Sequence, residues 1–115
     1  TWEASESFHL EHSQHVQAWV KNDHLGFEIL YVFKGVVRKY RPDYLVRLAN
    51  GIALVLEVKG QESDEDRAKK HALDLWVNAV NQHAGFGQWA SATSRHPGEI
   101  DGILNHEASR RSEAG

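Results

Sequence analysis

The chain has 115 residues, a net charge of −3 and no cysteine, with 41% hydrophobic and 25% charged residues. This length supports one hydrophobic core, and the composition excludes a disordered or fibrous chain. The lack of cysteine excludes disulfides and thiolate nucleophiles. Because no apolar run is long enough to cross a bilayer and the first residues lack a secretory-signal layout, we expect a cytoplasmic protein with no membrane partner.

The first half of the chain predicts one helix and two strands. Thr1 can cap a helix that begins at "WEAS", and its end is left open over residues 10–20. The aromatic and β-branched run "GFEILYVFKG" (residues 26–35) predicts a strand that ends in a tight Lys-Gly turn. A second strand is expected over residues 36–48, and Pro42 marks an edge, a bulge or a break in it because proline donates no ladder hydrogen bond.

The second half predicts a strand, a long helix, a short strand and a closing helix. Residues 52–59 are apolar until the last three, which is typical of a central strand covered on both faces. "SDEDRAKKHALDLWVNAVNQH" predicts a helix capped by Ser63, with acids in its first turn and an apolar stripe. "GFGQWASAT" predicts the strand and "PGEIDGILNHEA" the closing helix. We therefore expect one α/β domain over residues 1–108, with a mixed four-stranded sheet flanked by helices and a disordered tail at 109–115.

The turn at residues 49–51 decides how two acids are arranged. A two-residue turn would place Asp43 and Glu57 on opposite faces of the sheet. A three-residue loop, with Gly51 in the left-handed conformation, would place Asp43 directly opposite Glu57. Only the second register gives one face that is apolar throughout and places the charged side chains on the other, and each misplaced large side chain costs about 1 to 3 kcal/mol. We expect the second register, with Lys59 beside the two carboxylates.

Two opposed carboxylates repel each other, so the pair needs a positive partner. Lys59 can supply part of that charge, and a hard divalent cation held by both acids would supply more. Mg²⁺ favours sites with one or two carboxylates, several waters and a phosphate oxygen. This set suits phosphodiester hydrolysis, in which the metal lowers the pKa of a bound water while the lysine orients or deprotonates the nucleophile and stabilises the transition state.

These residues resemble the signature of a known nuclease superfamily. Pro42-Asp43, a spacer and then Glu57-Val58-Lys59 resemble the PD-(D/E)xK motif, which lies on a β-hairpin in a restriction-endonuclease-like αβββαβ core. Together with "VKNDHLGF", "YRPDYLVRL", "LVLEVKG", "WVNAVN" and "FGQW", the chain from Trp2 to Ala92 resembles the C-terminal endonuclease domain of the Res subunit of type III restriction enzymes.

The resemblance implies a function and a set of site residues. It implies a Mg²⁺-dependent endonuclease acting on double-stranded DNA, with Mn²⁺ as an expected substitute. In a full-length parent, its partners would be an ATP-dependent helicase-like motor and a modification subunit. Asp43, Glu57 and the main-chain carbonyl of Val58 would be metal ligands and Lys59 the catalytic lysine. Glu3 matches a helical glutamate that many members place near the metal.

Cations near this motif are candidates for DNA contacts. Between residues 34 and 47 there are five cations and one anion, and we expect Arg38, Lys39 and Arg41 to approach the DNA backbone. The alternative is that these are the solvated positions of an alternating strand. Lys69 lies beside the apolar stripe of the long helix and is a candidate phosphate contact, unless it follows the stripe edge or pairs with an acid.

Two other functions remain open from the sequence. The same fold could be a catalytically silent module that binds DNA or a partner domain. The histidines at three-residue spacing, His9, His12 and His15, could bind a transition metal if the first helix continues that far.

Overall fold

A computed structural model describes residues 2–83 and 85–110, with only the backbone described for residues 2–5. The elements in chain order are α1 (Trp2–His12), β1 (Val16–Lys21), β2 (Ile29–Phe33), β3 (Val36–Tyr40), β4 (Tyr44–Leu48), β5 (Ala53–Val58), α2 (Asp64–Gln82), β6 (Trp89–Ser94), a 3₁₀ turn η1 (Pro97–Glu99) and α3 (Ile100–Ala108). The predicted cap Thr1 and residues 111–115 of the predicted tail lie outside the described residues. Ser109 still belongs to the end of α3, because its backbone N–H donates to the carbonyl of Asn105.

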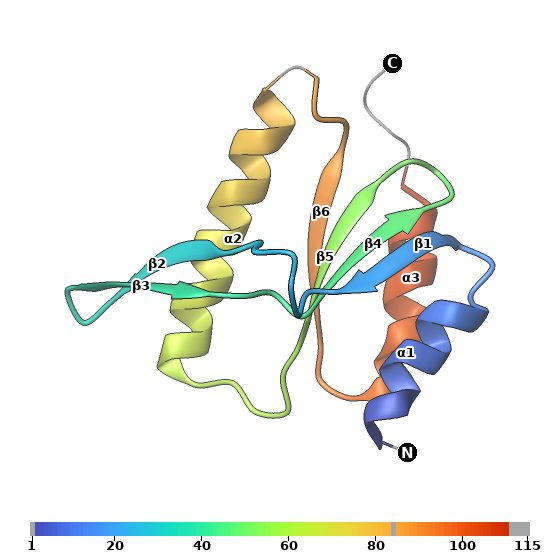
Figure 1. Cartoon of the computed structure of the whole chain (residues 1–115), viewed down its shortest axis with the longest axis horizontal. Coiled ribbons are helices and arrows are strands. Elements are labelled where there is room, and N and C mark those ends of the chain that lie inside the picture. The colour runs from blue at the N-terminus through green and yellow to red at the C-terminus, as the bar shows by residue number, and fades with distance from the viewer. Residues whose placement is uncertain (1, 84, 111–115) are drawn as a thin grey trace.

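The main sheet has four strands in the order β1-β4-β5-β6. β4 is antiparallel to both of its neighbours, whereas β5 and β6 run parallel and are joined by α2. In Figure 1, α2 lies to one side of these strands and α1 and α3 lie together on the other. The predicted α/β class with a mixed four-stranded sheet flanked by helices is confirmed, and the order α1-β1-β4-β5-α2-β6 is compatible with an αβββαβ core.

The strands that build this sheet are not all the expected ones. β1 occupies a segment for which the sequence predicts no strand, and it takes the edge position beside β4. Its side chains are half-buried or exposed, and its register shifts between Val16 and Ala18, so it shows neither an apolar run nor a regular alternation. The predicted strand at residues 26–35 forms β2, which pairs with β3 in a separate two-stranded sheet. The predicted break at Pro42 is confirmed, because it falls between β3 and β4.

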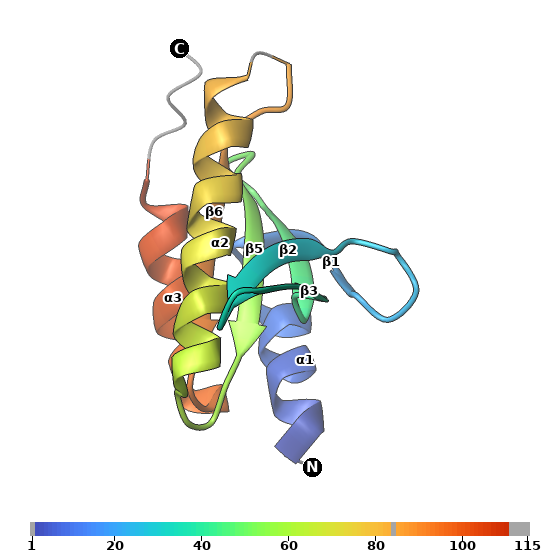
Figure 2. The ribbon, with the colours of Figure 1, turned by 90° about the vertical axis from the view of Figure 1, so that its left-hand side faces the viewer.

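The hairpin of β2 and β3 projects beside α2. Its turn is the predicted Lys34-Gly35 pair, and both residues have positive φ, 52° and 76°. Figure 1 shows the tip of the hairpin extending beyond α2, and Figure 2 looks onto α2 with β2 beside it. Ile29 and Tyr31 are buried against this helix. The hairpin therefore covers the α2 side of the domain.

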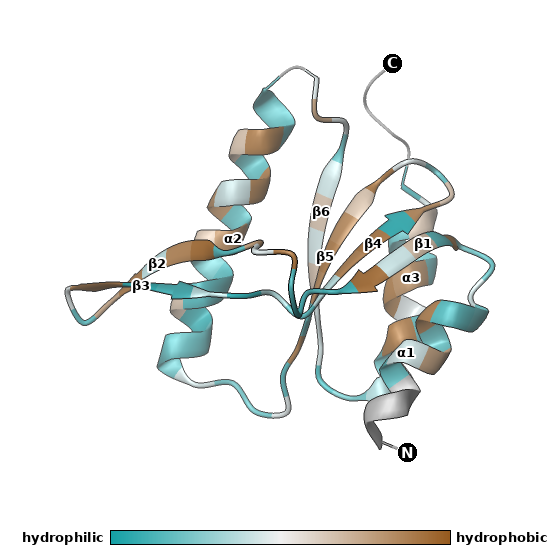
Figure 3. Cartoon of the chain, in the orientation of Figure 1, coloured by the Kyte–Doolittle hydropathy of each residue, from teal (hydrophilic) through white to brown (hydrophobic). Residues whose placement is uncertain are grey.

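Two hydrophobic cores lie on the two faces of β5, in agreement with its predicted central position. Leu54 and Leu56 face the core shared with α1 and α3, whereas Val55 faces the core shared with α2 and the hairpin; all three are 0% exposed. Figure 3 shows hydrophobic residues along β2, β4, β5 and α3, whereas β3 is hydrophilic beyond its first residues. Because both faces of β5 are buried, its polar residues must lie at its ends. The C-terminal end of β5 carries the candidate site.

Helix α2 begins at the predicted position. Ser63 accepts a hydrogen bond from the backbone N–H of Asp66, and the Asp66 side chain accepts one from the backbone N–H of Ser63. This capping box satisfies two otherwise unpaired donors and fixes the first turn of the helix. Of the predicted apolar stripe, Leu73 and Val77 are buried and Trp76 is half-buried. No helix within residues 2–83 and 85–110 is both long and apolar enough to span a bilayer.

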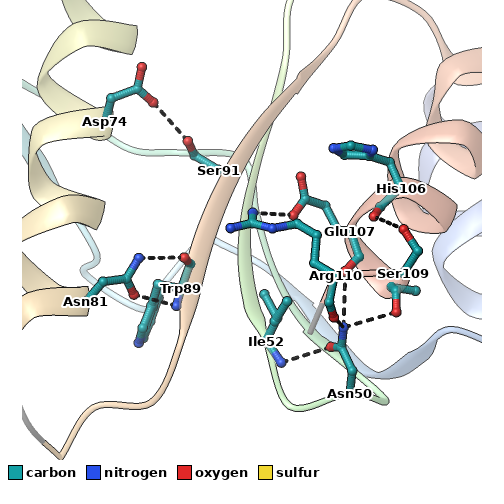
Figure 4. Close-up of polar contacts among 11 residues, drawn as sticks. Asn50, Ile52, Asp74, Asn81, Trp89, Ser91, His106, Glu107, Ser109 and Arg110 are labelled. Carbon is teal, nitrogen blue, oxygen red and sulfur yellow. Dashed lines mark hydrogen bonds and ion pairs between the residues drawn. The ribbon is translucent and has the colours of Figure 1, made fainter. Parts of the chain in front are cut away.

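The turn between β4 and β5 also anchors α3. Gly51 has φ of 93°, and the strand register pairs Arg47 with Ala53, as the three-residue loop predicts. The Asn50 side chain lies over the end of α3, where its Nδ2 donates to the carbonyls of Glu107, Ala108 and Arg110 at 3.1, 3.2 and 3.1 Å (Figure 4). Its Oδ1 accepts from the backbone N–H of Ile52. One side chain thus fixes the loop and caps the helix.

Replacing Asn50 by aspartate should destabilise the fold by about 2 kcal/mol, because the amide donors are lost and a carboxylate then faces helix carbonyls. The matched control is Asn105→Asp, which places an acid in the last turn of the same helix on an exposed side chain. We expect the control to lose less than about 1 kcal/mol. Urea unfolding of both variants measures the difference, and equal losses would show that the Asn50 amide contributes nothing.

The last strand is held against α2 at two points, both drawn in Figure 4. Asn81 exchanges two hydrogen bonds with the backbone of Trp89, at 2.9 and 2.7 Å. The hydroxyl of Ser91 donates to Asp74 at 3.0 Å. These bonds fix the distance between β6 and α2, and this pair of elements forms two walls of the cavity described below.

Candidate active site

Asp43 and Glu57 lie opposite each other at one end of the β4–β5 pair. Each carboxylate accepts a hydrogen bond from the backbone of the other strand: the N–H of Asp43 donates to Glu57 Oε1 at 3.0 Å, and the N–H of Val58 donates to Asp43 Oδ2 at 2.7 Å. The register continues the pairing of Tyr44 with Leu56, so the predicted opposition of the two acids is confirmed. The reciprocal bonds lock both side chains where the strands meet the loops.

The environment of Glu57 disfavours its charged form. The residue is 6% exposed. Burial, and after it the carboxylate of Asp43, raises the pKa of Glu57 to about 7, against the smaller lowering effects of Lys59, the Asp43 N–H and Lys69. Negative charge at this point is therefore not balanced by the surrounding protein groups.

Lys59 follows β5 on the face of the sheet that carries the two acids. Its Nζ lies 3.8 Å from Oδ1 of Asp66, in the first turn of α2. The backbone N–H of Ser63, followed by its side chain and the two lysines nearby, lowers the pKa of Asp66, so this acid is a stable anionic partner. The ammonium group thus lies against the start of α2, and its charge also lowers the pKa of Glu57.

A cavity of about 430 Å³ opens beside Glu57 and Lys59. Its walls come from β5, α2 and β6. The charged side chains that line it are four cations and four acids: Lys59, Lys69, Lys70, Arg95, Glu57, Glu62, Asp66 and Asp74. Asp43 is not among the lining residues. The lining carries no net charge, so an added cation would make the cavity attractive to an anion.

Tyr40 also lines this cavity and is fixed by its hydroxyl, which donates to the carbonyl of Lys69 at 3.2 Å. Burial, together with the nearby carboxylates of Glu57, Asp74 and Asp43, raises the pKa of Tyr40. The hydroxyl therefore stays protonated and acts as a donor.

The donor set fits a divalent cation of the kind that prefers oxygen. Asp43 and Glu57 each use one oxygen on the opposite strand, which leaves the second oxygen without a hydrogen-bond donor among the described residues. The unbalanced negative charge that raises the pKa of Glu57 would be relieved by a cation. With the Val58 carbonyl and water completing the shell, the set matches the preference of Mg²⁺ for few carboxylates. No group of three or more His, Asp or Glu residues suited to a metal occurs in the described part of the chain.

Three of the predicted DNA contacts lie on or after β3, and each is paired with an acid. Arg38 lies 3.1 Å from Glu65 of α2. Lys39 and Arg41 lie 3.9 and 3.3 Å from the two carboxylate oxygens of Glu28. All three cations are exposed, so they remain available to a polyanion, but the acids reduce the local positive charge.

Lys69 is the predicted contact that the structure places in the cavity. Its Nζ lies 5.7 Å from the ring centre of Tyr31 and 5.6 Å from that of Tyr40. Cation–π contacts of this kind hold the ammonium group without using its hydrogen-bond donors. Its role as a phosphate contact stays a prediction.

The histidine hypothesis is wrong for the described residues. Helix α1 ends at His12, so the helix does not reach His15. His9 lies 3.1 Å from Asp101 on α3, whereas His12 contacts the carbonyl of Phe8 in its own helix. The three histidines are not part of any metal-binding group among the described residues. The predicted Glu3 lies in α1, but its side chain falls outside the described residues.

Sequence reasoning missed five of the charged residues that line the cavity: Glu62, Asp66, Lys70, Asp74 and Arg95. The sequence indicates only a helix-capping role for Asp66, the partner of Lys59. Arg95 lines the cavity and lies directly after β6. Because the carboxyl ends of parallel strands meet at one edge, the predicted parallel pair could have placed Arg95 beside Lys59.

Comparisons with protein families, with curated proteins and with solved structures gave no match to this chain. The resemblance to PD-(D/E)xK nucleases therefore remains a prediction from the motif.

Proposed function

We propose that this chain is a divalent-metal-dependent endonuclease domain that hydrolyses DNA phosphodiester bonds, of the kind found in the cleavage module of type III restriction enzymes. The observation that carries the proposal is the lock between Asp43 and Glu57, with Lys59 beside them on the same sheet face. A buried Glu57 carboxylate that faces the half-buried carboxylate of Asp43 weakens the fold unless a cation joins the two. A site that binds and releases a metal explains why this arrangement exists.

Each residue has a distinct role in the proposal. Asp43, Glu57 and the Val58 carbonyl would hold Mg²⁺, or Mn²⁺ in its place. The bound metal supplies a water of lowered pKa and neutralises charge on the phosphate. Lys59 lies in reach of the same cavity and would orient the attacking water and stabilise the developing negative charge.

The proposed substrate is double-stranded DNA in the cytoplasm. Phosphates would enter the cavity beside Glu57, while Arg38, Lys39 and Arg41 contact the backbone outside it. In a longer parent protein, a helicase-like motor and a modification subunit would supply target recognition.

Plasmid nicking tests the proposal. Supercoiled plasmid incubated with the wild-type chain and Mg²⁺ should be converted to open-circular or linear DNA, and EDTA should prevent it. Asp43→Asn should lower the rate roughly 100-fold or more, because a metal ligand loses its charge. The variant keeps an oxygen that can accept from the Val58 N–H, so the β4–β5 hairpin should stay intact.

The matched control is Asp101→Asn, an exposed acid on α3 that pairs with His9 outside the site. This control should cleave at the wild-type rate. Equal cleavage by Asp43→Asn and the wild type would refute the proposal, and so would no cleavage by either. In the second case, DNA binding by both would favour the silent binding module.

A further inference from the structure

The exits of β5 and β6 bring two cations side by side. The strands are parallel, Val58 is paired with Ser94, and the N–H of Lys59 donates to the Ser94 carbonyl at 2.9 Å. The next residue on β6 is Arg95, which lines the same cavity as Lys59. Ser94 is 0% exposed, and its hydroxyl donates to the carbonyl of His96 at 2.8 Å. The backbone that carries Arg95 is therefore fixed relative to Lys59.

Both cations are held loosely by acids of the α2 region. Lys59 Nζ lies 3.8 Å from Asp66, and Arg95 Nη2 lies 3.7 Å from Glu62. Strong charge-assisted hydrogen bonds are about 2.7 to 2.9 Å long, so neither pair is closed tightly. The arginine side chain is 48% exposed, and exposed ion pairs contribute little to stability. Exchanging these acids for another anion would therefore cost little.

Each acid also has a second partner that remains when its cation moves. Glu62 lies 3.6 Å from Nη1 of Arg67, and Asp66 accepts from the backbone N–H of Ser63 at 3.2 Å. Neither carboxylate would be left unpaired if Lys59 and Arg95 turned toward a ligand. This arrangement differs from a closed structural ion pair, in which removing one partner leaves the other unpaired.

We propose that Arg95 is a phosphate-binding residue, and that together with Lys59 it forms a two-cation clamp for a backbone phosphate of DNA. The guanidinium fork can donate two hydrogen bonds to one phosphate, while the lysine supplies a point charge from the neighbouring strand. The choice of DNA as ligand rests on the proposed function, but the clamp binds without hydrolysis and is tested separately from it.

The test is binding of a fluorescein-labelled DNA duplex of about 20 base pairs, followed by fluorescence anisotropy in EDTA so that no metal-dependent cleavage occurs. Arg95→Gln should weaken binding about 10-fold, the loss expected for a charged hydrogen-bonded contact, and should reduce the slope of log affinity against log salt by about one. Arg95→Lys keeps the charge without the fork and should lie between the wild type and Arg95→Gln.

The matched control is Arg67→Gln, because Arg67 is exposed and pairs with the same Glu62 but does not line the cavity. It should change affinity by no more than about twofold. Equal losses in Arg67→Gln and Arg95→Gln would overturn the clamp, as would a wild-type chain that fails to bind the duplex. Far-ultraviolet circular dichroism shows whether the variants are folded. If Arg95→Gln is unfolded, the affinity of Arg95→Lys decides the outcome. Failure of plasmid cleavage would refute the nuclease proposal but would leave this comparison of affinities unchanged.

Discussion

Replacing Glu57 by glutamine should stabilise the folded domain by about 3 kcal/mol at pH 8 in the absence of metal, while lowering Mg²⁺-dependent cleavage roughly 100-fold. The pKa of Glu57 rises from 4.5 to about 7 on folding, chiefly through burial and then through the charge of Asp43. Glutamine removes the buried charge, and its Oε1 can still accept the hydrogen bond from the Asp43 N–H. Stability and activity should thus change in opposite directions at one position.

The stabilisation should depend on pH in a defined window. Below pH 4.5 the acid is protonated in both the folded and the unfolded chain, so the wild type and the variant should be equally stable. Between pH 4.5 and about 7, the limits set by the raised pKa of Glu57, the folded chain binds more protons than the unfolded chain. The stability of the wild type should therefore fall as pH rises through this window, and above pH 7 the difference should be constant.

Urea unfolding in EDTA at pH 4, 6 and 8 measures this difference. The matched control is Glu107→Gln, a buried glutamate with 7% exposure that is paired with Arg110 at 2.8 Å. Removing that charge should be neutral or destabilising, because its partner is left behind. A Glu57→Gln variant that is less stable than the wild type at pH 8 would contradict a charge penalty at this site.

The arrangement of the acids could be predicted because it follows from sorting side chains. Only the three-residue loop gives β4 and β5 one face that is apolar throughout, toward α1 and α3, and leaves the charged residues on the other face with Leu45 and Val55. This register alone sets Asp43 opposite Glu57. The energy difference between the two registers is a sum over many side chains. It is therefore larger than the uncertainty in the burial energy of any one side chain. Gly51 and Pro42 reinforce the result, because each marks a backbone position that few other residues favour.

The rest of the site depends on contacts that no local pattern contains. β1 is an exposed edge strand, and its place in the sheet comes from pairing with β4 rather than from its own side chains. The partner of Lys59 is a capping acid of α2, and the partners of Arg38 and Lys39 come from other elements. Ion pairs between distant segments contribute little energy, so the residue pattern of either segment does not predict them. Their identity follows from the tertiary fold.

The second large effect is expected in the hydrophobic core. Leu54→Ala should destabilise the domain by about 3 kcal/mol and lower its melting temperature by roughly 10 to 15 °C. Leu54 is 0% exposed, lies on the central strand and belongs to the core shared with α1 and α3. Truncation would remove buried contacts and leave a cavity that neighbouring strands, fixed by their hydrogen bonds, cannot fill.

The same substitution at Leu75 is the matched control. Leu75 is 56% exposed on α2, and Leu75→Ala should change stability by less than about 0.5 kcal/mol. Thermal unfolding followed by circular dichroism compares the two variants. Losses of equal size would show that Leu54 is not packed in a closed core.

Leu54→Ala also tests whether a change on one face of the sheet affects cleavage at the site on the other face. Side chains alternate along β5, so Leu54 faces α1 and α3, whereas Glu57 and Lys59 lie toward the α2 cavity. At temperatures where the variant remains folded, plasmid cleavage per molecule should therefore equal that of the wild type. Suppose instead that the folded variant loses as much cleavage as Asp43→Asn. The core shared with α1 and α3 would then help to position the two carboxylates, and the β4–β5 hairpin alone would not fix them.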